Sequence, residues 1–191
     1  MSKNRMEAFS DGVVAILITI MVLDLKVPHG SDLADLVPLG PVFLSYVLSF
    51  ALLGTYWNNH HHLLQAARVV DGRVLWANLA LLFTLSLVPF ATAWMGETVF
   101  APVPTAVYGV VSLMAALTYY ILVRALIRAR GQAPTLARAV GTDRKGMISP
   151  ALYAVAIPVA LVAPAIAILL FATVVALWIV PDLRIERALA E

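Results

Sequence analysis

Cysteine is absent from the 191-residue sequence, which excludes disulfide bonds, thiolate metal sites and cysteine nucleophiles. Charged residues are also scarce: they make up 13% of the chain, against roughly 25% in typical soluble proteins. Hydrophobic residues reach 62% and the mean hydropathy is +0.91, which leaves too little polar surface to cover a soluble globule. The composition therefore predicts an integral membrane protein.

Motifs of common catalytic and nucleotide-binding sites are missing as well. The sequence contains no G-x-S-x-G elbow, no Walker loop and no H-E-x-x-H pattern. The net charge of +2 does not indicate a nucleic-acid partner, because the basic residues lie between apolar segments and form no basic soluble region. We therefore expect no enzyme, no cofactor and no bound nucleic acid.

Long apolar runs dominate the sequence. A helix needs about 20 mostly apolar residues to cross a bilayer. The expected transmembrane helices cover residues 5–27, 38–64, 74–95, 104–127, 148–162 and 165–180. The last two come from one run of more than 30 residues, which Pro158 and Pro164 are expected to break into a tight hairpin. The predicted fold class is all-α, a single six-helix transmembrane domain covering residues 1–191.

Lysine and arginine are distributed unevenly among the connections between these helices. Twelve of the thirteen lie at the N-terminus, in the connections after the second and fourth helices, or in the C-terminal tail, and Lys26 alone lies on the other side. Cytoplasmic loops are enriched in positive charge. We therefore expect a multi-pass protein of the cell membrane with both termini in the cytoplasm.

The first helix has two different faces. One stripe, at 100° per residue, is formed by Ile16, Thr19, Ile20 and Leu23. Asp11 points about 140° away from Ile16, and an ionisable residue inside a span is costly unless it faces a partner or water. The stripe fits ordinary helix packing as well as a functional surface, and Asp11 fits either a buried structural anchor or a direct role in transport.

Further polar residues occur in the second and third helices. They are Trp57, Asn58, Asn59, His60, His61, His62, Trp76 and Asn78. Consecutive residues on a helix are 100° apart, so the three adjacent histidines cannot all bind one ion, and we expect no metal site. Hydrogen bonds between helices are the expected use, with Ser10, Asp11, His60 or His61, and Asn78 as the candidates.

The first helix also carries a recognisable motif. The string Arg5-x-x-x-Phe9-Ser10-Asp11-Gly12-Val13-x-Ala15-Ile16-x-x-Thr19 resembles the signature of the transmembrane protein 175 family, which comprises lysosomal potassium channels and their bacterial relatives. The resemblance continues in Leu23 and Pro28, in Trp57 with the histidine run, and in Trp76-x-Asn78 with Pro89-Phe90. The second half of the chain is similar to the family only in hydropathy and topology.

This resemblance implies a potassium-selective channel that lacks the Thr-Val-Gly-Tyr-Gly filter and whose first helix lines an hourglass pore. It assigns the constriction to Ile16, Ile20 and Leu23, and a selective threonine ring to Thr19. It assigns a structural polar network to Arg5, Phe9, Ser10, Asp11, Trp57, His60, His61 and Asn78. Animal members contain the six-span unit twice. Phe-Ser-Asp occurs once here, so a four-fold pore implies a homotetramer in the lipid bilayer, with potassium ions as the permeant ligand.

Other functions remain open. A secondary transporter or a proton-conducting pore would use Asp11, the latter together with the histidines. A membrane enzyme would use the histidine run, and a purely structural scaffold would need none of these residues. Near the expected outer mouth, Asp24, Asp32 and Asp35 would favour cations in a channel, or they are ordinary loop charges and helix caps.

Overall fold

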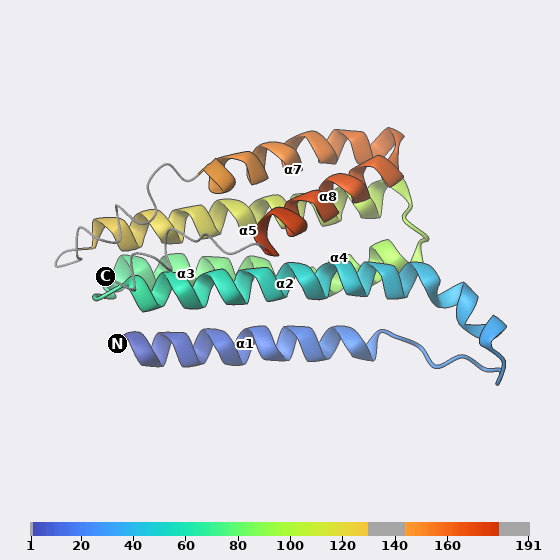
Figure 1. Ribbon diagram of the computed structural model, residues 1–191, viewed down its shortest axis with the longest axis horizontal. Coiled ribbons are helices and arrows are strands. Elements are labelled where there is room, and N and C mark those ends of the chain that lie inside the picture. Colours follow the sequence, from blue (N-terminus) through green and yellow to red (C-terminus); the bar gives the residue numbers. More distant parts are fainter. Residues whose placement is uncertain (1, 130–143, 180–191) are drawn as a thin grey trace.

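The computed structural model contains only helices within the ranges that it describes, which are residues 2–129 and 144–179 (Figure 1). In chain order the elements are α1 (Lys3–Leu23), the 3₁₀ helix η1 (Leu33–Leu39), α2 (Gly40–Ala66), α3 (Gly72–Ser86), α4 (Val88–Glu97), α5 (Pro102–Arg128), α7 (Arg144–Val162) and α8 (Pro164–Ile179). The predicted all-α fold class is confirmed.

Five helical segments of the described chain are long and apolar enough to cross a membrane. They are Lys3–Leu23, Leu33–Ala66, Gly72–Glu97, Pro102–Arg128 and Lys145–Val162. The sixth apolar helix, α8, has 16 residues, which at a rise of 1.5 Å per residue gives a length of about 24 Å. This is shorter than the hydrocarbon core of about 30 Å. The chain is therefore a multi-pass membrane protein, while a crossing by α8 stays a prediction.

In the C-terminal hairpin, the break between the two helices is not where the prolines predicted it. Pro158 was expected to break the run, but it lies inside α7, and Ala163 alone separates α7 from α8. Membrane helices tolerate an internal proline because neighbouring groups satisfy the backbone carbonyl that it leaves free. Pro164 is the first residue of α8, a position where a backbone N–H has no partner within the helix.

Two other boundaries also differ. The predicted helix 74–95 is divided at Leu87 into α3 and α4, because Pro89 has no N–H to donate to the carbonyl of Leu85. The first helix ends at Leu23, four residues earlier than predicted. Its last turn closes with a bond from the N–H of Asp24 to the carbonyl of Met21, and the chain then leaves in an extended connection towards η1.

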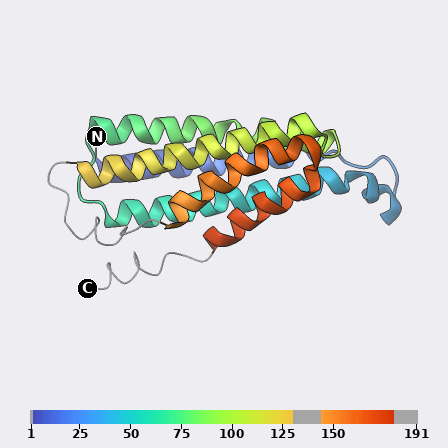
Figure 2. The same cartoon turned by 90° about the horizontal axis from the view of Figure 1, so that it is seen from above.

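The helices run along one common direction, with α1 at one edge of the bundle (Figure 1). One end of the bundle contains the start of α1, the α2–α3 connection, the end of α5 and the start of α7; we call it the N-terminal end. The opposite end contains the α1–α2, α4–α5 and α7–α8 connections. Figure 2 shows α8 folding back from this opposite end beside α7 and α2.

The centre of the fold is α5. It packs against α3, α4, α7 and α8, and its Ala115, Leu122 and Leu126 have no exposed surface. Close packing here depends on Gly109, because a Cβ at this position would lie 3.0 Å from Ile157 and 3.0 Å from Phe171. By contrast, the main contacts of α1 are with α2, α3 and α4, and its opposite face is exposed and lacks a partner among the described residues.

Candidate functional site

The unpartnered face of α1 carries the predicted pore residues. Ile16, Ile20 and Leu23 are 57%, 45% and 78% exposed, and Thr19 is exposed beside them. The opposite face packs on the bundle through Met6, Ser10, Val14, Leu17 and Met21. Within each face the residues recur at spacings of three or four positions, as the helical period predicts. The outward face is therefore an apolar stripe with one hydroxyl group in it.

The hydroxyl group of Thr19 has a defined orientation. Its Oγ1 lies 3.1 Å from the carbonyl oxygen of Ala15 and 2.9 Å from that of Ile16, and it donates its hydrogen to this pair. A threonine hydroxyl has one hydrogen and two lone pairs. Because the hydrogen is used by the helix backbone, the side chain offers an acceptor oxygen to anything that contacts this face.

Behind this face, α1 is joined to the bundle by a buried chain of hydrogen bonds. Ser10 donates to the carbonyl oxygen of Met6 (2.9 Å), and Asn78 Nδ2 donates to Ser10 Oγ (2.9 Å). His60 Nε2 lies 2.8 Å from Asn78 Oδ1, which can only accept, so His60 carries a hydrogen on Nε2. Ser10, Asn78 and His60 are 2%, 2% and 5% exposed. Three helices, α1, α2 and α3, therefore meet in one satisfied network.

Asp11 takes a different partner. Its Oδ1 accepts a hydrogen bond from the indole Nε1 of Trp57 at 3.0 Å. The Trp57 ring stacks on His61 with a centroid separation of 6.3 Å and an interplanar angle of 19°. The carboxylate thus lies beside the buried chain and is held by α2.

A third cluster lies one helical turn nearer the N-terminal end. Glu7 Oε1 is 2.9 Å from His61 Nδ1, and Gln65 Nε2 is 2.8 Å from His61 Nε2. These contacts fit a neutral imidazole that donates through Nδ1 and accepts through Nε2. Neither Glu7 nor Gln65 was predicted from the sequence to take part in a site. The available signal was spacing, because Glu7 precedes Asp11 by four residues and Gln65 follows His61 by four.

The remaining predicted network residues are more exposed. Arg5 is exposed and, among the described residues, forms no hydrogen bond or ion pair, while Phe9 is 51% exposed. Both lie on α1 near its outward face, and a place in the network stays a prediction for them.

The three adjacent histidines make different contacts. His60 bonds to Asn78 and His61 to Glu7, while the ring of His62 packs edge-on against His61 at 5.8 Å. Within residues 2–129 and 144–179, no three His, Asp or Glu side chains come together as a metal site would require.

The acidic residues near the α1–α2 connection lie at the opposite end of the bundle. The backbone N–H of Asp32 donates to Asp35 Oδ2 at 3.0 Å, at the start of η1. Asp35 therefore acts as a helix cap, one of the two uses that the sequence left open. Asp24 is exposed directly after the last residue of α1.

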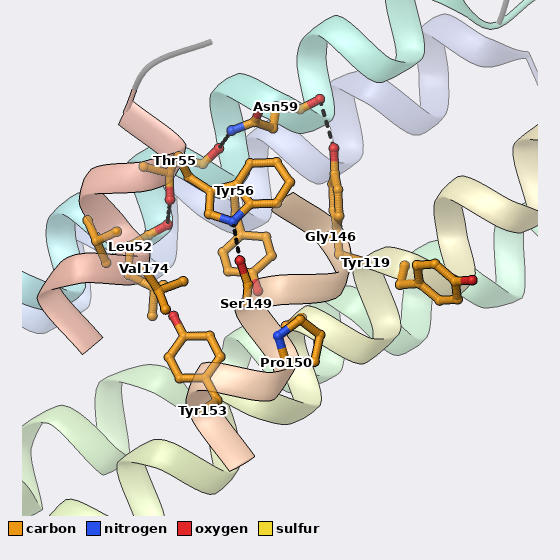
Figure 3. A pocket seen from close by; sticks show the side chains of 14 residues that line it. Leu52, Thr55, Tyr56, Asn59, Tyr119, Gly146, Ser149, Pro150, Tyr153 and Val174 are labelled. Carbon is orange, nitrogen blue, oxygen red and sulfur yellow. Dashed lines mark hydrogen bonds between the residues drawn. The ribbon is translucent and has the colours of Figure 1, made fainter. Parts of the chain in front are cut away.

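A separate cavity lies between α2, α5, α7 and α8, away from α1 (Figure 3). Its volume is about 30 Å³, enough for about two water molecules. Several lining groups already bond within the chain: Tyr119 donates to the carbonyl oxygen of Asn59 at 3.2 Å, and Trp178 donates to Ser149 at 2.7 Å. This cavity is too small to serve as an ion pathway. The candidate site is the outward face of α1, because its apolar side chains and the hydroxyl of Thr19 are exposed.

Known proteins similar to this chain are ion channels. The family model described as Endosomal/lysosomal potassium channel TMEM175 matches residues 5–89. A potassium channel of Chryseobacterium sp. (strain P1-3) is 50% identical over 191 residues, which cover 100% of both chains. The human endosomal/lysosomal proton channel TMEM175 is 41% identical over 99 residues, which cover 46% of this chain and 19% of the human protein.

A solved structure extends the similarity to the second half of the chain. The crystal structure of a lysosomal potassium-selective channel TMEM175 homolog from Chamaesiphon minutus matches with a TM-score of 0.81 at 27% identity. The match covers 94% of this chain and 97% of the other. The similarity in fold therefore includes α5, α7 and α8, where the sequence offered only hydropathy and topology.

Proposed function

Because this chain is a member of the transmembrane protein 175 family, as the motif of its first helix predicted, we propose that it is a potassium-selective channel formed by four copies around a central pore. Its relatives are potassium and cation channels and not enzymes, in agreement with the expected lack of enzymatic activity. In this proposal α1 of each copy lines the pore.

The observation that carries the proposal is the outward face of α1. Ile16, Ile20 and Leu23 are exposed in a chain that buries the other side of the same helix. Four copies around an axis would bring these side chains into stacked apolar rings. A narrow apolar neck resists wetting and raises the barrier to a hydrated ion. Conduction then requires the neck to widen.

Thr19 supplies the polar ring between the apolar ones. Its hydrogen is held by the backbone carbonyl oxygens of Ala15 and Ile16, so four oxygens would face the axis as acceptors. Acceptor oxygens replace part of the hydration shell of a cation, and the absence of formal charge keeps binding weak enough for rapid release. Cations are favoured over anions because no donor hydrogen points into the pore.

The direct experiment is ion flux into vesicles that contain the purified protein. With a potassium gradient, we expect rapid potassium uptake that exceeds sodium uptake under the same gradient, and neither in vesicles without protein. A fluorescent reporter of membrane potential measures both. Equal uptake of the two ions would contradict potassium selectivity. No uptake by a protein that elutes as a single tetrameric species would contradict an open channel.

A proton conductance is the second candidate, because the human relative is named a proton channel. Asp11 and the pair formed by Glu7 and His61 are groups at the α1–α2 contact that could carry protons. The same vesicles, with a pH-sensitive dye inside and no potassium gradient, test this directly. Acidification driven by a pH gradient and unaffected by potassium would favour protons as the principal ion.

We also propose six spans within one domain of residues 1–191, in the cell membrane, with the N-terminal end of the bundle in the cytoplasm. The support is the distribution of charge. The described basic residues of the N-terminal end are Lys3, Arg5, Arg68, Arg73, Arg124, Arg128, Arg144 and Lys145. Cytoplasmic connections are the ones enriched in such residues.

This orientation is testable because the sequence contains no cysteine. Ser2→Cys and Ser31→Cys each introduce a single thiol at an exposed position, one at each end of the bundle. In intact cells we expect a membrane-impermeant maleimide to label Ser31→Cys and to label Ser2→Cys only after permeabilisation. The reverse pattern would show that the N-terminal end faces outwards.

A further inference from the structure

The end of the bundle opposite the N-terminus contains one paired cation. Among the described residues, Lys26 is the only lysine or arginine at this end, and its Nζ lies 2.7 Å from Glu97 Oε1. Lys26 follows the last residue of α1 by three positions, and Glu97 is the last residue of α4. Asp24 lines the same cavity of about 480 Å³ as this pair. The pair therefore connects the end of the proposed pore helix to the end of α4.

Solvent reaches both members of the pair. The side chains of Lys26 and Glu97 are 74% and 51% exposed, and ion pairs exposed to this degree contribute little to stability. Glu97 raises the pKa of Lys26, so the ammonium group keeps its charge throughout the neutral range. The main consequence of the contact is therefore electrostatic: Glu97 cancels a positive charge that Lys26 would otherwise present.

That charge lies close to the proposed neck. Lys26 lies three positions after Leu23, and consecutive Cα atoms are 3.8 Å apart, so the two Cα atoms are at most about 11 Å apart. The Debye length at physiological ionic strength is about 8 Å. At about 50 mM salt the Debye length of about 14 Å exceeds this separation, so an ion that approaches the apolar ring of Leu23 feels a charge on Lys26; at physiological and higher salt concentrations the charge is increasingly screened.

We propose that Glu97 is a conductance-determining residue, which keeps the outer mouth attractive to cations by neutralising Lys26. With Lys26 cancelled, the remaining carboxylates of this end, Asp24, Asp32 and Asp35, set a negative potential at the mouth. Without Glu97, four unpaired ammonium groups would surround the entrance of the tetramer and lower the local potassium concentration. This inference rests on the proposed function, since it assumes that α1 lines the pore.

The test is a double-mutant cycle on Lys26 and Glu97, in which the single-channel potassium current is measured in planar bilayers. The variants are Glu97→Gln, Lys26→Gln and the double variant, each compared with the unmodified protein at about 50 mM and about 1 M KCl, where the Debye lengths are about 14 Å and 3 Å. At low salt, Glu97→Gln is expected to lower the current that enters from this end about threefold. At high salt the current recovers. Lys26→Gln is expected to show no loss, and the double variant to resemble the unmodified protein.

The double variant separates charge from a mechanical tether between α1 and α4. If the ion pair only holds the two helices together, both single variants and the double variant lose current alike, at both salt concentrations, and the inference is overturned. An unchanged current for Glu97→Gln at low salt also overturns it. An unmodified protein that carries no potassium at either concentration refutes the proposed function first and the inference with it.

Discussion

Thr19→Val is expected to reduce the preference for potassium over sodium about fivefold, which corresponds to a total of about 1 kcal/mol in the free-energy difference between the two ions in the pore. Valine keeps the shape of threonine and carries a methyl group in place of the hydroxyl. The hydroxyl of Thr19 bonds within its own helix and to no other element, so the substitution breaks no tertiary contact. Reversal potentials under mixed potassium and sodium gradients measure the change.

The matched control is Thr173→Val. Thr173 is exposed on α8 and donates to the carbonyl oxygen of Leu169 at 2.7 Å, the same type of contact within a helix, but α8 packs mainly against α7, α2 and α5. We expect its reversal potential to equal that of the unmodified protein. If Thr19→Val leaves the reversal potential unchanged while both variants elute as the intact oligomer, the threonine ring does not select the ion.

Asn78→Leu is expected to destabilise the protein by about 2 kcal/mol and to reduce the fraction recovered as the assembled oligomer. Asn78 accepts from His60 and donates to Ser10, and all three are buried. Leucine fills a similar volume but leaves both neighbours without their partner, and unsatisfied groups buried in a membrane protein are costly. The midpoint of thermal aggregation in detergent, followed by size-exclusion chromatography, measures the effect.

A control for this substitution is Ser86→Ala. Ser86 lies on the same element as Asn78, is exposed, and donates only to the carbonyl oxygen of Phe83 at 2.7 Å. We expect it to shift the midpoint little, since an exposed bond within one helix turn is readily replaced. A midpoint for Asn78→Leu equal to that of Ser86→Ala would mean that the buried chain of hydrogen bonds does not hold α1 in place.

The helices were predictable from the sequence because hydropathy and helical period are local properties. The stripe of Ile16, Ile20 and Leu23 could be separated from the buried face of α1 before any contact was known, since residues on a helix turn by 100° each. Pro158 was misjudged for the opposite reason. Whether a proline breaks a membrane helix depends on which neighbours satisfy the freed carbonyl, and these neighbours come from other elements.

The pairing of the polar side chains also depends on contacts between elements, which the local sequence does not reveal. Ser10, Asn78 and His60 form hydrogen bonds between helices, and Trp57, which the family resemblance placed in the network, is the partner of Asp11, but the sequence did not show which member bonds to which. Glu7 had no assigned role, yet it bonds to His61. The polar residues that form hydrogen bonds between helices could be chosen by residue type and by depth in the membrane. Which of them bond to each other depends on how α1 and α2 are aligned along their length.

By itself the sequence determined the membrane class, the positions of the apolar helices and the two faces of α1, because composition and period act over a few residues. Only the tertiary structure decided which polar groups meet, such as Lys26 with Glu97, which are 71 residues apart. A hydrogen bond requires its donor and acceptor to lie within about 3 Å and to be aligned. That geometry is set by the angles at which the helices cross and by their relative shifts along the bundle. A local sequence pattern does not encode either quantity.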